Sequence, residues 1–293
     1  MTQSDQPAGT QGGARVYLFP KRSDAPPTAH APAARAPAAH APVAPGVRVR
    51  GAHLAFAGTR LFDRLDLDLA GGEITCLLGP SGVGKTSLLR LIAGLADAAG
   101  GEVTDDGGQP LTGRIAYMAQ QDLLLPWLSA RANVLLGPRL RGEAITRAMR
   151  ARADDLLNRV GLAEAADARP GALSGGMRQR VALARTLLED RPVVLMDEPF
   201  AGLDAITRYE LQALAAELLD RRTVLLVTHD PLEALRLGHR IRVLAGRPAR
   251  LDDSVAAPPG APPRPADQVA DRQGMLLDRL AAAKQAQREA GDG

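Results

Sequence analysis

Lysine, cysteine and long apolar runs are all scarce in this 293-residue chain. Only three of its 36 Lys and Arg residues are lysine, so a lysine inside a motif is informative. The single cysteine, Cys76, excludes a disulfide framework within the chain, and its apolar neighbours predict a small buried hydrophobe. No run of about 18 uncharged apolar residues occurs, and the N-terminal residues lack a charged segment followed by an apolar one. These absences argue against a membrane span or a secretory signal, and we expect a cytoplasmic protein.

Net charge is also small and gives no sign of a nucleic-acid partner. The formal charge is +3 at pH 7. Residues 1–45 hold four basic and two acidic side chains, which account for +2 and leave +1 for the rest. A nucleic-acid-binding face needs clustered basic residues, whereas the high pI here reflects an excess of arginine near neutrality. We therefore predict no nucleic acid among the partners.

Composition divides the chain into a folded part and two flanking segments. Hydrophobic residues make up 45% of the chain, which is enough to bury a substantial core. Residues 1–45 carry repeated Ala-Pro and Ala-His units without apolar periodicity, a pattern that predicts a disordered tail. A folded domain is predicted over 46–252, a Pro-rich linker over 253–267 and a C-terminal helix within 268–293, clearest from about Gln268 to Arg288. No chemistry is assigned to that helix.

Alternating strand and helix patterns predict an α/β architecture. Apolar runs on both sides of the Gly58-Thr59 turn predict an antiparallel hairpin of Val47–Leu54 and Leu61–Leu69. Five more strand-like runs alternate with helical segments. They are Ile74–Leu78, Arg114–Met118, Val193–Met196, Val224–Val227 and Arg240–Leu244. Helical patterns without strands, among them Glu143–Val160, predict an inserted helical subdomain over about 122–172.

A glycine-rich loop follows the first of these five runs and reads Gly79-Pro80-Ser81-Gly82-Val83-Gly84-Lys85-Thr86. This is the Walker A pattern. Its glycines allow successive N–H groups to point inward at phosphate oxygens, and Lys85 adds positive charge. A helix beginning near Ser87 favours the same anion at its N-terminus, and Thr86 is placed to ligate Mg²⁺. We therefore predict that Gly79 through Ser87 bind nucleotide phosphates, the alternative being a structural turn before a helix.

A second motif reads Leu173-Ser174-Gly175-Gly176-Met177-Arg178-Gln179-Arg180. It resembles the signature motif of the ATP-binding cassette (ABC) ATPases, with Met177 in place of the common glutamine. Ser174 can cap the helix, and Gly175 and Gly176 leave its first turn bare as a second anion site. The resemblance implies that Ser174, Gly175 and Gly176 contact ATP held by a second ATPase subunit in a head-to-tail homodimer.

An apolar strand ends in two carboxylates in Val193-Val194-Leu195-Met196-Asp197-Glu198, the Walker B form. Adjacent acids at a strand end can divide two roles between them, one holding Mg²⁺ and one activating water. By resemblance, Asp197 takes the metal side and Glu198 is the catalytic base. His229, after Val224–Val227, matches the family's switch histidine, which contacts the γ-phosphate. His53 and His239 are expected to be structural.

A glutamine after the strand Arg114–Met118 takes the Q-loop position of the family. Gln120 lies six residues before Pro126, and the resemblance implies that its amide reaches Mg²⁺ and the attacking water. The neighbouring Gln121 is an alternative register. The chain's one tryptophan, Trp127, follows in Leu-Leu-Leu-Pro-Trp-Leu. It is either an apolar anchor for a membrane subunit or a core residue of the helical subdomain.

Two further positions match the family less closely. Leu203-Asp204 match the D-loop, so Asp204 is expected near the nucleotide of the dimer, although Ala201-Gly202 replace the commoner Ser-Ala. Phe56 sits where family members carry an aromatic residue that stacks on adenine, and the alternative is a buried hydrophobe of the hairpin.

The resemblance covers about residues 47–250 with the motifs in the family's order. It implies the P-loop NTPase fold of ABC ATPases, with an antiparallel β subdomain and an inserted helical subdomain, and it implies ATP and Mg²⁺ as cofactors. The segment around Trp127 resembles importer ATPases for nitrate, sulfonates, taurine and thiamine-type pyrimidine precursors. We therefore predict an importer ATPase, peripheral on the inner face of the cell membrane.

The resemblance also implies partners outside this chain. They are membrane permease subunits, a second ATPase subunit and, indirectly, an extracytoplasmic solute-binding protein. The alternative within the class is the ATPase of an unfused exporter or lipoprotein-release system. A DNA-repair cassette would carry a coiled-coil or zinc-bearing insertion, and a translation factor would carry two cassettes. A non-catalytic binding module is disfavoured by Glu198 and His229.

Overall fold

The computed structural model describes residues 43–56, 59–96, 100–252 and 255–289. For residues 56, 59, 256, 288 and 289 it describes the backbone alone. The expected tail, residues 1–45, lies outside these ranges except for its last three residues. Of these, Ala44 is buried and donates its N–H to the Arg221 carbonyl.

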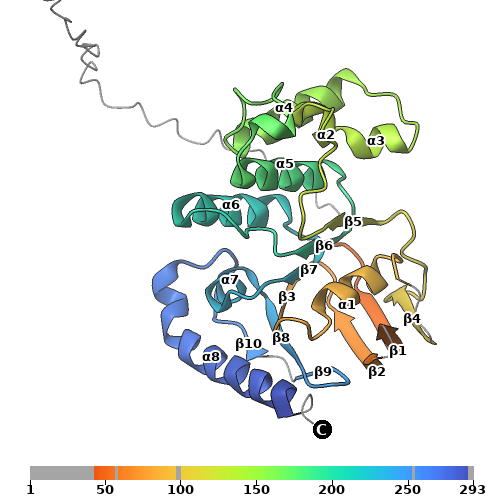
Figure 1. Ribbon diagram of the computed structural model, residues 1–293, viewed down its shortest axis with the longest axis vertical. Helices are drawn as coiled ribbons and strands as arrows, with labels where there is room; N and C mark the ends of the chain where they lie inside the picture. The colour runs from red at the N-terminus through yellow and green to blue at the C-terminus, as the bar shows by residue number, and fades with distance from the viewer. Residues whose placement is uncertain (1–42, 57–58, 97–99, 253–254, 290–293) are drawn as a thin grey trace, which may run out of the picture. The chain divides into compact units, whose positions relative to one another are not determined.

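A three-stranded antiparallel sheet contains the predicted hairpin (Figure 1). Its strands pair in the order β2-β1-β4, where β1 is Val47–Phe56, β2 is Thr59–Leu69 and β4 is Gly100–Asp105. In β2, buried leucines alternate with exposed aspartates, as expected for a sheet with one face against the core. The sequence does not predict β4, because its two glycines and a glutamate have little of the β-branched character typical of strands.

A second, mostly parallel sheet forms the centre of the fold. Its strands run in the order β10-β8-β3-β7-β6-β5, and β9 pairs with β8 outside this path. They are β3 (Ile74–Leu78), β5 (Ile115–Met118), β6 (Val193–Asp197), β7 (Thr223–Val227), β8 (Arg240–Ala245), β9 (Arg250–Leu251) and β10 (Val255–Ala256). β3, β6 and β7 are buried throughout, which is typical of parallel strands covered on both faces. The five longer strands lie where the apolar runs predict them.

Parallel pairing brings three strand ends to one edge of this sheet. Val227 at the end of β7 pairs with Leu77 of β3 on one side and with Asp197 of β6 on the other. The segments that follow these strands therefore emerge side by side, the arrangement in which open α/β sheets bind ligands.

Eight α-helices complete the part of the chain that the structure describes. They are α1 (Lys85–Ile92), α2 (Ala130–Val134), α3 (Leu136–Leu140), α4 (Arg147–Arg159), α5 (Gly175–Leu188), α6 (Ala205–Leu218), α7 (Pro231–Leu237) and α8 (Ala266–Glu289). Figure 1 shows α2 to α5 gathered together, and buried residues of α2, α4 and α5 join residues of β5 and β6 in one apolar cluster. The helix predicted over Glu143–Val160 begins at Arg147, because the Thr146 hydroxyl accepts the Met149 N–H and caps it there.

The C-terminal helix α8 packs against α7 and β8 (Figure 1). Val269, Leu276 and Ala283 are its buried residues. The preceding Pro-rich segment contributes Arg264, which is 4% exposed and donates through Nη1 to carbonyls at the end of α7. A buried, hydrogen-bonded guanidinium therefore fixes the start of α8 against α7.

Candidate functional site

The loop between β3 and α1 adopts a backbone conformation that its glycines allow. Gly79, Gly82 and Gly84 have φ angles of 150°, 77° and 110°. A Cβ at Gly79 would lie 2.3 Å from the Leu244 carbonyl oxygen, so glycine alone fits there. Lys85 Nζ donates to two carbonyls of this loop, at 2.7 and 2.9 Å. The loop thus holds its lysine close, in the form expected of a phosphate cradle.

A buried carboxylate at the end of β6 lies beside this loop. Thr86 Oγ1 donates to Asp197 Oδ2 at 2.7 Å, and Asp197 is 1% exposed. Burial raises the pKa of Asp197, while the Thr86 bond and the charge of Lys85 act in the opposite direction. Burial lowers the pKa of Lys85, and Glu198 and Asp197 oppose that shift. Hydroxyl and carboxylate oxygens beside a phosphate loop are the donor set that Mg²⁺ prefers, so these residues fit a magnesium site.

Glu198 and His229 form a contact on the same sheet edge. Glu198 Oε2 lies 2.7 Å from His229 Nδ1, and the Glu198 N–H donates to the Val227 carbonyl at 2.9 Å. Glu198 has a φ of 52°, a conformation that is uncommon for a residue with a Cβ. Its side chain is 12% exposed, whereas that of His229 is 72% exposed. A mostly buried carboxylate therefore contacts an exposed imidazole, an arrangement suited to general-base chemistry.

The signature motif forms the start of α5. Ser174 Oγ accepts the Met177 N–H at 3.2 Å and caps the helix. Ser174 and Gly175 are exposed, and Gly176 faces the Gly202–Leu203 turn. Across the described ranges, no hydrogen bond or ion pair links these three residues to the phosphate loop. The structure thus brings Lys85, Thr86, Asp197, Glu198 and His229 together and leaves the signature residues apart from them.

A buried glutamine of α5 connects the signature helix to Glu198, and the sequence does not single it out. Gln179 is 7% exposed, and its Nε2 donates to the carbonyls of Glu198 and Pro199 at 3.3 and 3.1 Å. The available signal was a polar residue on a helix face that is otherwise apolar. That signal alone does not say which backbone the amide contacts.

Two arginines of α5 hold the segment after Gln120 in place. Arg178 Nε donates to Asp122 Oδ2 at 2.9 Å, and Arg185 donates to the carbonyls of Asp122 and Leu123 at 2.7 and 3.0 Å. Burial lowers the pKa of Arg185. Gln120 itself is exposed, two residues after the end of β5. The signature helix therefore contacts both Glu198, through Gln179, and the segment that follows Gln120.

One asparagine holds the loop that carries Trp127 through hydrogen bonds to its backbone. Asn133 is fully buried, and its Nδ2 donates to three carbonyls of residues 125–129, at 3.1 to 3.3 Å. Its Oδ1 accepts the Leu125 N–H at 2.8 Å. Trp127 is 65% exposed and Leu123 is 59% exposed. The alternative that Trp127 is a core residue of the helical segment is therefore wrong.

Other predicted residues have varied settings. Asp204 caps α6 by accepting the Thr207 N–H at 2.9 Å, and this bond lowers the pKa of Asp204. Phe56 ends β1, and its side chain lies outside the described part of the structure. Cys76 is buried, as predicted. His239 Nδ1 accepts the Ile74 N–H at 3.0 Å, which is a structural role.

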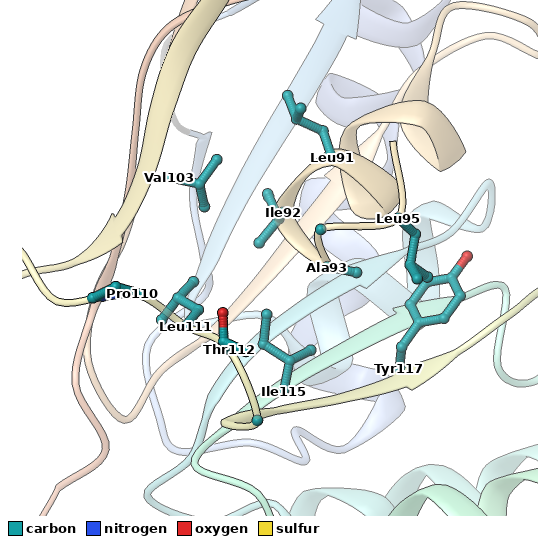
Figure 2. A pocket seen from close by; sticks show the side chains of 12 residues that line it. Leu91, Ile92, Ala93, Leu95, Val103, Pro110, Leu111, Thr112, Ile115 and Tyr117 are labelled. Carbon is teal, nitrogen blue, oxygen red and sulfur yellow. The ribbon is translucent and has the colours of Figure 1, made fainter. Parts of the chain in front are cut away.

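An apolar pocket of about 450 Å³ opens between the end of α1, the segment before β5 and β5 itself. Figure 2 shows Leu91, Ile92 and Ala93 on one side, with Leu95 beside the ring of Tyr117. Leu95 is 62% exposed. A concave apolar surface with an exposed leucine is typical of a site that receives another protein's side chains.

None of the helices in the described ranges is both long and apolar enough to cross a membrane.

Comparison with known proteins places this geometry in a family. Residues 62–201 match the family model described as ABC transporter. The aliphatic sulfonates import ATP-binding protein SsuB 1 of Pseudomonas syringae pv. syringae is 42% identical over 236 residues, covering 80% of this chain and 92% of that protein. The aliphatic sulfonates import ATP-binding protein SsuB 3 of Nocardia farcinica is 47% identical over 210 residues, covering 71% and 79%.

A solved structure agrees with these relatives. The dimeric structure of a post-hydrolysis state of the ATP-binding cassette MJ0796, bound to ADP and Pi, matches with a TM-score of 0.66 and 29% identity. The match covers 73% of this chain and 100% of that one. The predicted P-loop fold of ABC ATPases is thereby confirmed, as is the resemblance to importer ATP-binding proteins. The chain belongs to the ATP-binding subunits of ABC transporters and is an ABC-type ATPase.

Proposed function

We propose that this chain is the ATP-hydrolysing motor of an importer for a small solute of the sulfonate, taurine, nitrate or hydroxymethylpyrimidine type. The observation that carries the hydrolytic part is the 2.7 Å contact between Glu198 and His229, next to the Lys85 loop. The importer assignment rests on relatives named for sulfonate import at 40–47% identity. The motor would act peripherally on the inner face of the membrane.

Each residue of the cradle has a distinct task in this proposal. The N–H groups of Gly79–Ser87 and the Lys85 ammonium bind the ATP phosphates. Thr86, Asp197 and Gln120 would hold Mg²⁺, which neutralises phosphate charge when bound. Glu198 accepts a proton from the attacking water, and His229 orients that water against the γ-phosphate.

A second copy of the chain completes the site in this proposal. The start of α5, formed by Ser174, Gly175 and Gly176, supplies N–H groups to the ATP held by the other copy. Asp204 would lie at the same junction, and Phe56 would stack on adenine. The matched cassette is named as dimeric, which supports a pairing of two copies.

Replacing Glu198 by Gln tests the hydrolytic part. The amide keeps the shape of the side chain but cannot accept the proton, so hydrolysis should fall by about 10²-fold or more while ATP binding persists. ATP turnover and nucleotide binding are measured on the same preparation, with the exposed Lys284→Met as the matched control. A Glu198→Gln chain that hydrolyses ATP normally would refute the assigned role.

The coupling part rests on exposed apolar residues next to the site. Trp127 and Leu123 would contact a permease subunit, and the pocket of Figure 2 would receive one of its side chains. Movement of this segment reaches Glu198 through Arg185, α5 and Gln179. A solute-binding protein would deliver cargo on the far side of the membrane.

Replacing Trp127 by Ala tests coupling. Because Trp127 is exposed, the change should leave basal hydrolysis of the isolated chain intact. Uptake of labelled sulfonate by vesicles that contain the whole transporter should fall about tenfold. Equal loss of hydrolysis and uptake would contradict the proposed contact. Labelled solute moving only outward would instead favour an exporter.

A further inference from the structure

The buried stripe of α8 ends in a polar residue. Val269, Leu276 and Ala283 recur every seven residues, and Gln287 lies four residues after Ala283 on the same helix face. Helical periodicity would place an apolar side chain there. Instead, the Oε1 atom of Gln287 is buried without a hydrogen-bond partner. Packing alone does not account for a half-buried amide whose oxygen is buried without a partner.

The other end of this amide contacts the phosphate loop. Gln287 Nε2 donates to the Ser81 carbonyl oxygen at 3.3 Å, across a sequence separation of 206 residues. This contact fixes which way the amide is turned, because its oxygen would repel the carbonyl. The helix to which the sequence assigned no chemistry therefore reaches the nucleotide site.

The bond acts on the peptide between Ser81 and Gly82, next to a glycine. A Cβ at Gly82 would meet no atom within 4 Å, so the space beside the Gly82 Cα is open. Gly82 has a φ of 77°, and glycine permits either orientation of that peptide. Lys85 Nζ donates to the carbonyls of Gly79 and Pro80, and Gln287 Nε2 donates to that of Ser81.

The two ends of a trans peptide point in opposite directions. A donor that holds the Ser81 carbonyl on the α8 side therefore turns the Gly82 N–H the other way, away from α8. In a phosphate loop, the useful orientation of an N–H group is toward the ligand.

We propose that Gln287 is a positioning residue that keeps the Gly82 N–H turned toward the phosphates of ATP. The proposal rests on the proposed role of the loop as the ATP cradle. It gives a task to α8, a helix that is held at its start and near its middle. Arg264 fastens its start to α7, and Arg279 pairs with Asp252 at 3.2 Å farther along.

Three variants of the full-length chain test this role. Gln287→Met keeps the length of the side chain and removes the donor, and Gln287→Lys restores a donor of similar reach. Lys284→Met changes an exposed residue of the same last turns of α8 and is the matched control. The measurements are kcat and KM for ATP, the Kd of a fluorescent ATP analogue, and the thermal unfolding temperature of each variant.

Gln287→Met should raise both KM and Kd about two- to tenfold, the range expected for one lost hydrogen bond. The kcat at saturating ATP should stay within about twofold, because Gln287 contacts no reacting atom. Gln287→Lys should recover most of the affinity. These expectations assume unfolding temperatures close to that of the native chain, and Gln287→Lys supplies the test should Gln287→Met unfold.

Three outcomes would overturn the proposal. They are unchanged Kd in Gln287→Met, tighter binding in that variant, and equal weakening in Lys284→Met. Tighter binding would show that α8 restrains the loop instead of supporting it. Measuring the Kd of the ATP analogue does not require hydrolysis. The result can therefore be interpreted even if Glu198→Gln retains full activity and the hydrolytic assignment fails.

Discussion

The two glycines at positions 79 and 82 of the phosphate loop should respond very differently to alanine. Both have positive φ, so each substitution carries a conformational cost. At Gly82 the new methyl group meets nothing within 4 Å, and the cost is that of the conformation alone, about 1–2 kcal/mol. At Gly79 the methyl group would lie 2.3 Å from the backbone oxygen of Leu244. No rotamer change can relieve this clash, because the obstacle is the main chain of β8.

The magnitude at Gly79 follows from two terms. A φ of 150° is strained for a residue with a Cβ, by about 1–3 kcal/mol, and forcing a methyl group into a packed site adds about 1–3 kcal/mol. A total near 4 kcal/mol corresponds to a fall in Tm of roughly 8–16 °C for a domain of this size. Gly82→Ala should lower Tm by roughly 2–8 °C.

The assay is thermal unfolding of the purified chain without nucleotide. Omitting nucleotide separates the stability of the loop from contacts that a methyl group at Gly82 would make with phosphate. Urea unfolding of the same samples gives the free-energy difference directly. Equal Tm values for the two variants, or a Gly79→Ala chain as stable as the native one, would refute the argument from the Leu244 carbonyl.

Three more predictions concern buried polar groups. Burial and Asp230 raise the pKa of Glu233 to about 8, so the folded chain holds a proton that the unfolded chain releases above its ordinary value of 4.5. Stability should therefore fall as pH rises from about 4.5 to about 8, and Glu233→Gln should flatten this slope in urea unfolding. Asn133→Ala should cost about 2–4 kcal/mol, because it removes four hydrogen bonds to backbone groups of the Trp127 loop, and proteolysis of that loop should quicken. Arg264→Met should free the start of α8 and speed hydrogen exchange there while the core stays protected.

The sequence predicts those parts of the fold whose cause is local. Buried parallel strands are apolar throughout, so β3, β6 and β7 are visible as runs. The phosphate loop is visible because its glycines and lysine meet a requirement within eight residues. β4 is different, since it becomes a strand by pairing with β1 and has no strand pattern of its own.

The parts of the site that the sequence does not reveal depend on contacts between distant segments. Gln179 and Gln287 are single polar residues on helix faces, a pattern shared by many residues with no special role. What distinguishes them is the backbone that each amide meets, Glu198 in one case and Ser81 in the other. Sequence spacing carries no information about these contacts, because the fold determines which backbone each amide reaches.

The placement of α5 suits the proposed connection between a permease contact and hydrolysis. On the proposed function, force enters at the exposed segment around Leu123, whose carbonyl Arg185 binds. A helix transmits displacement along its length, and Gln179 lies on it between Arg185 and the exposed cap at Ser174. Its amide bonds the carbonyl of Glu198, a residue already held at an uncommon φ. In that proposal, a shift of α5 would move both Glu198 and the cap at Ser174, so closure of the dimer and alignment of the base would occur together.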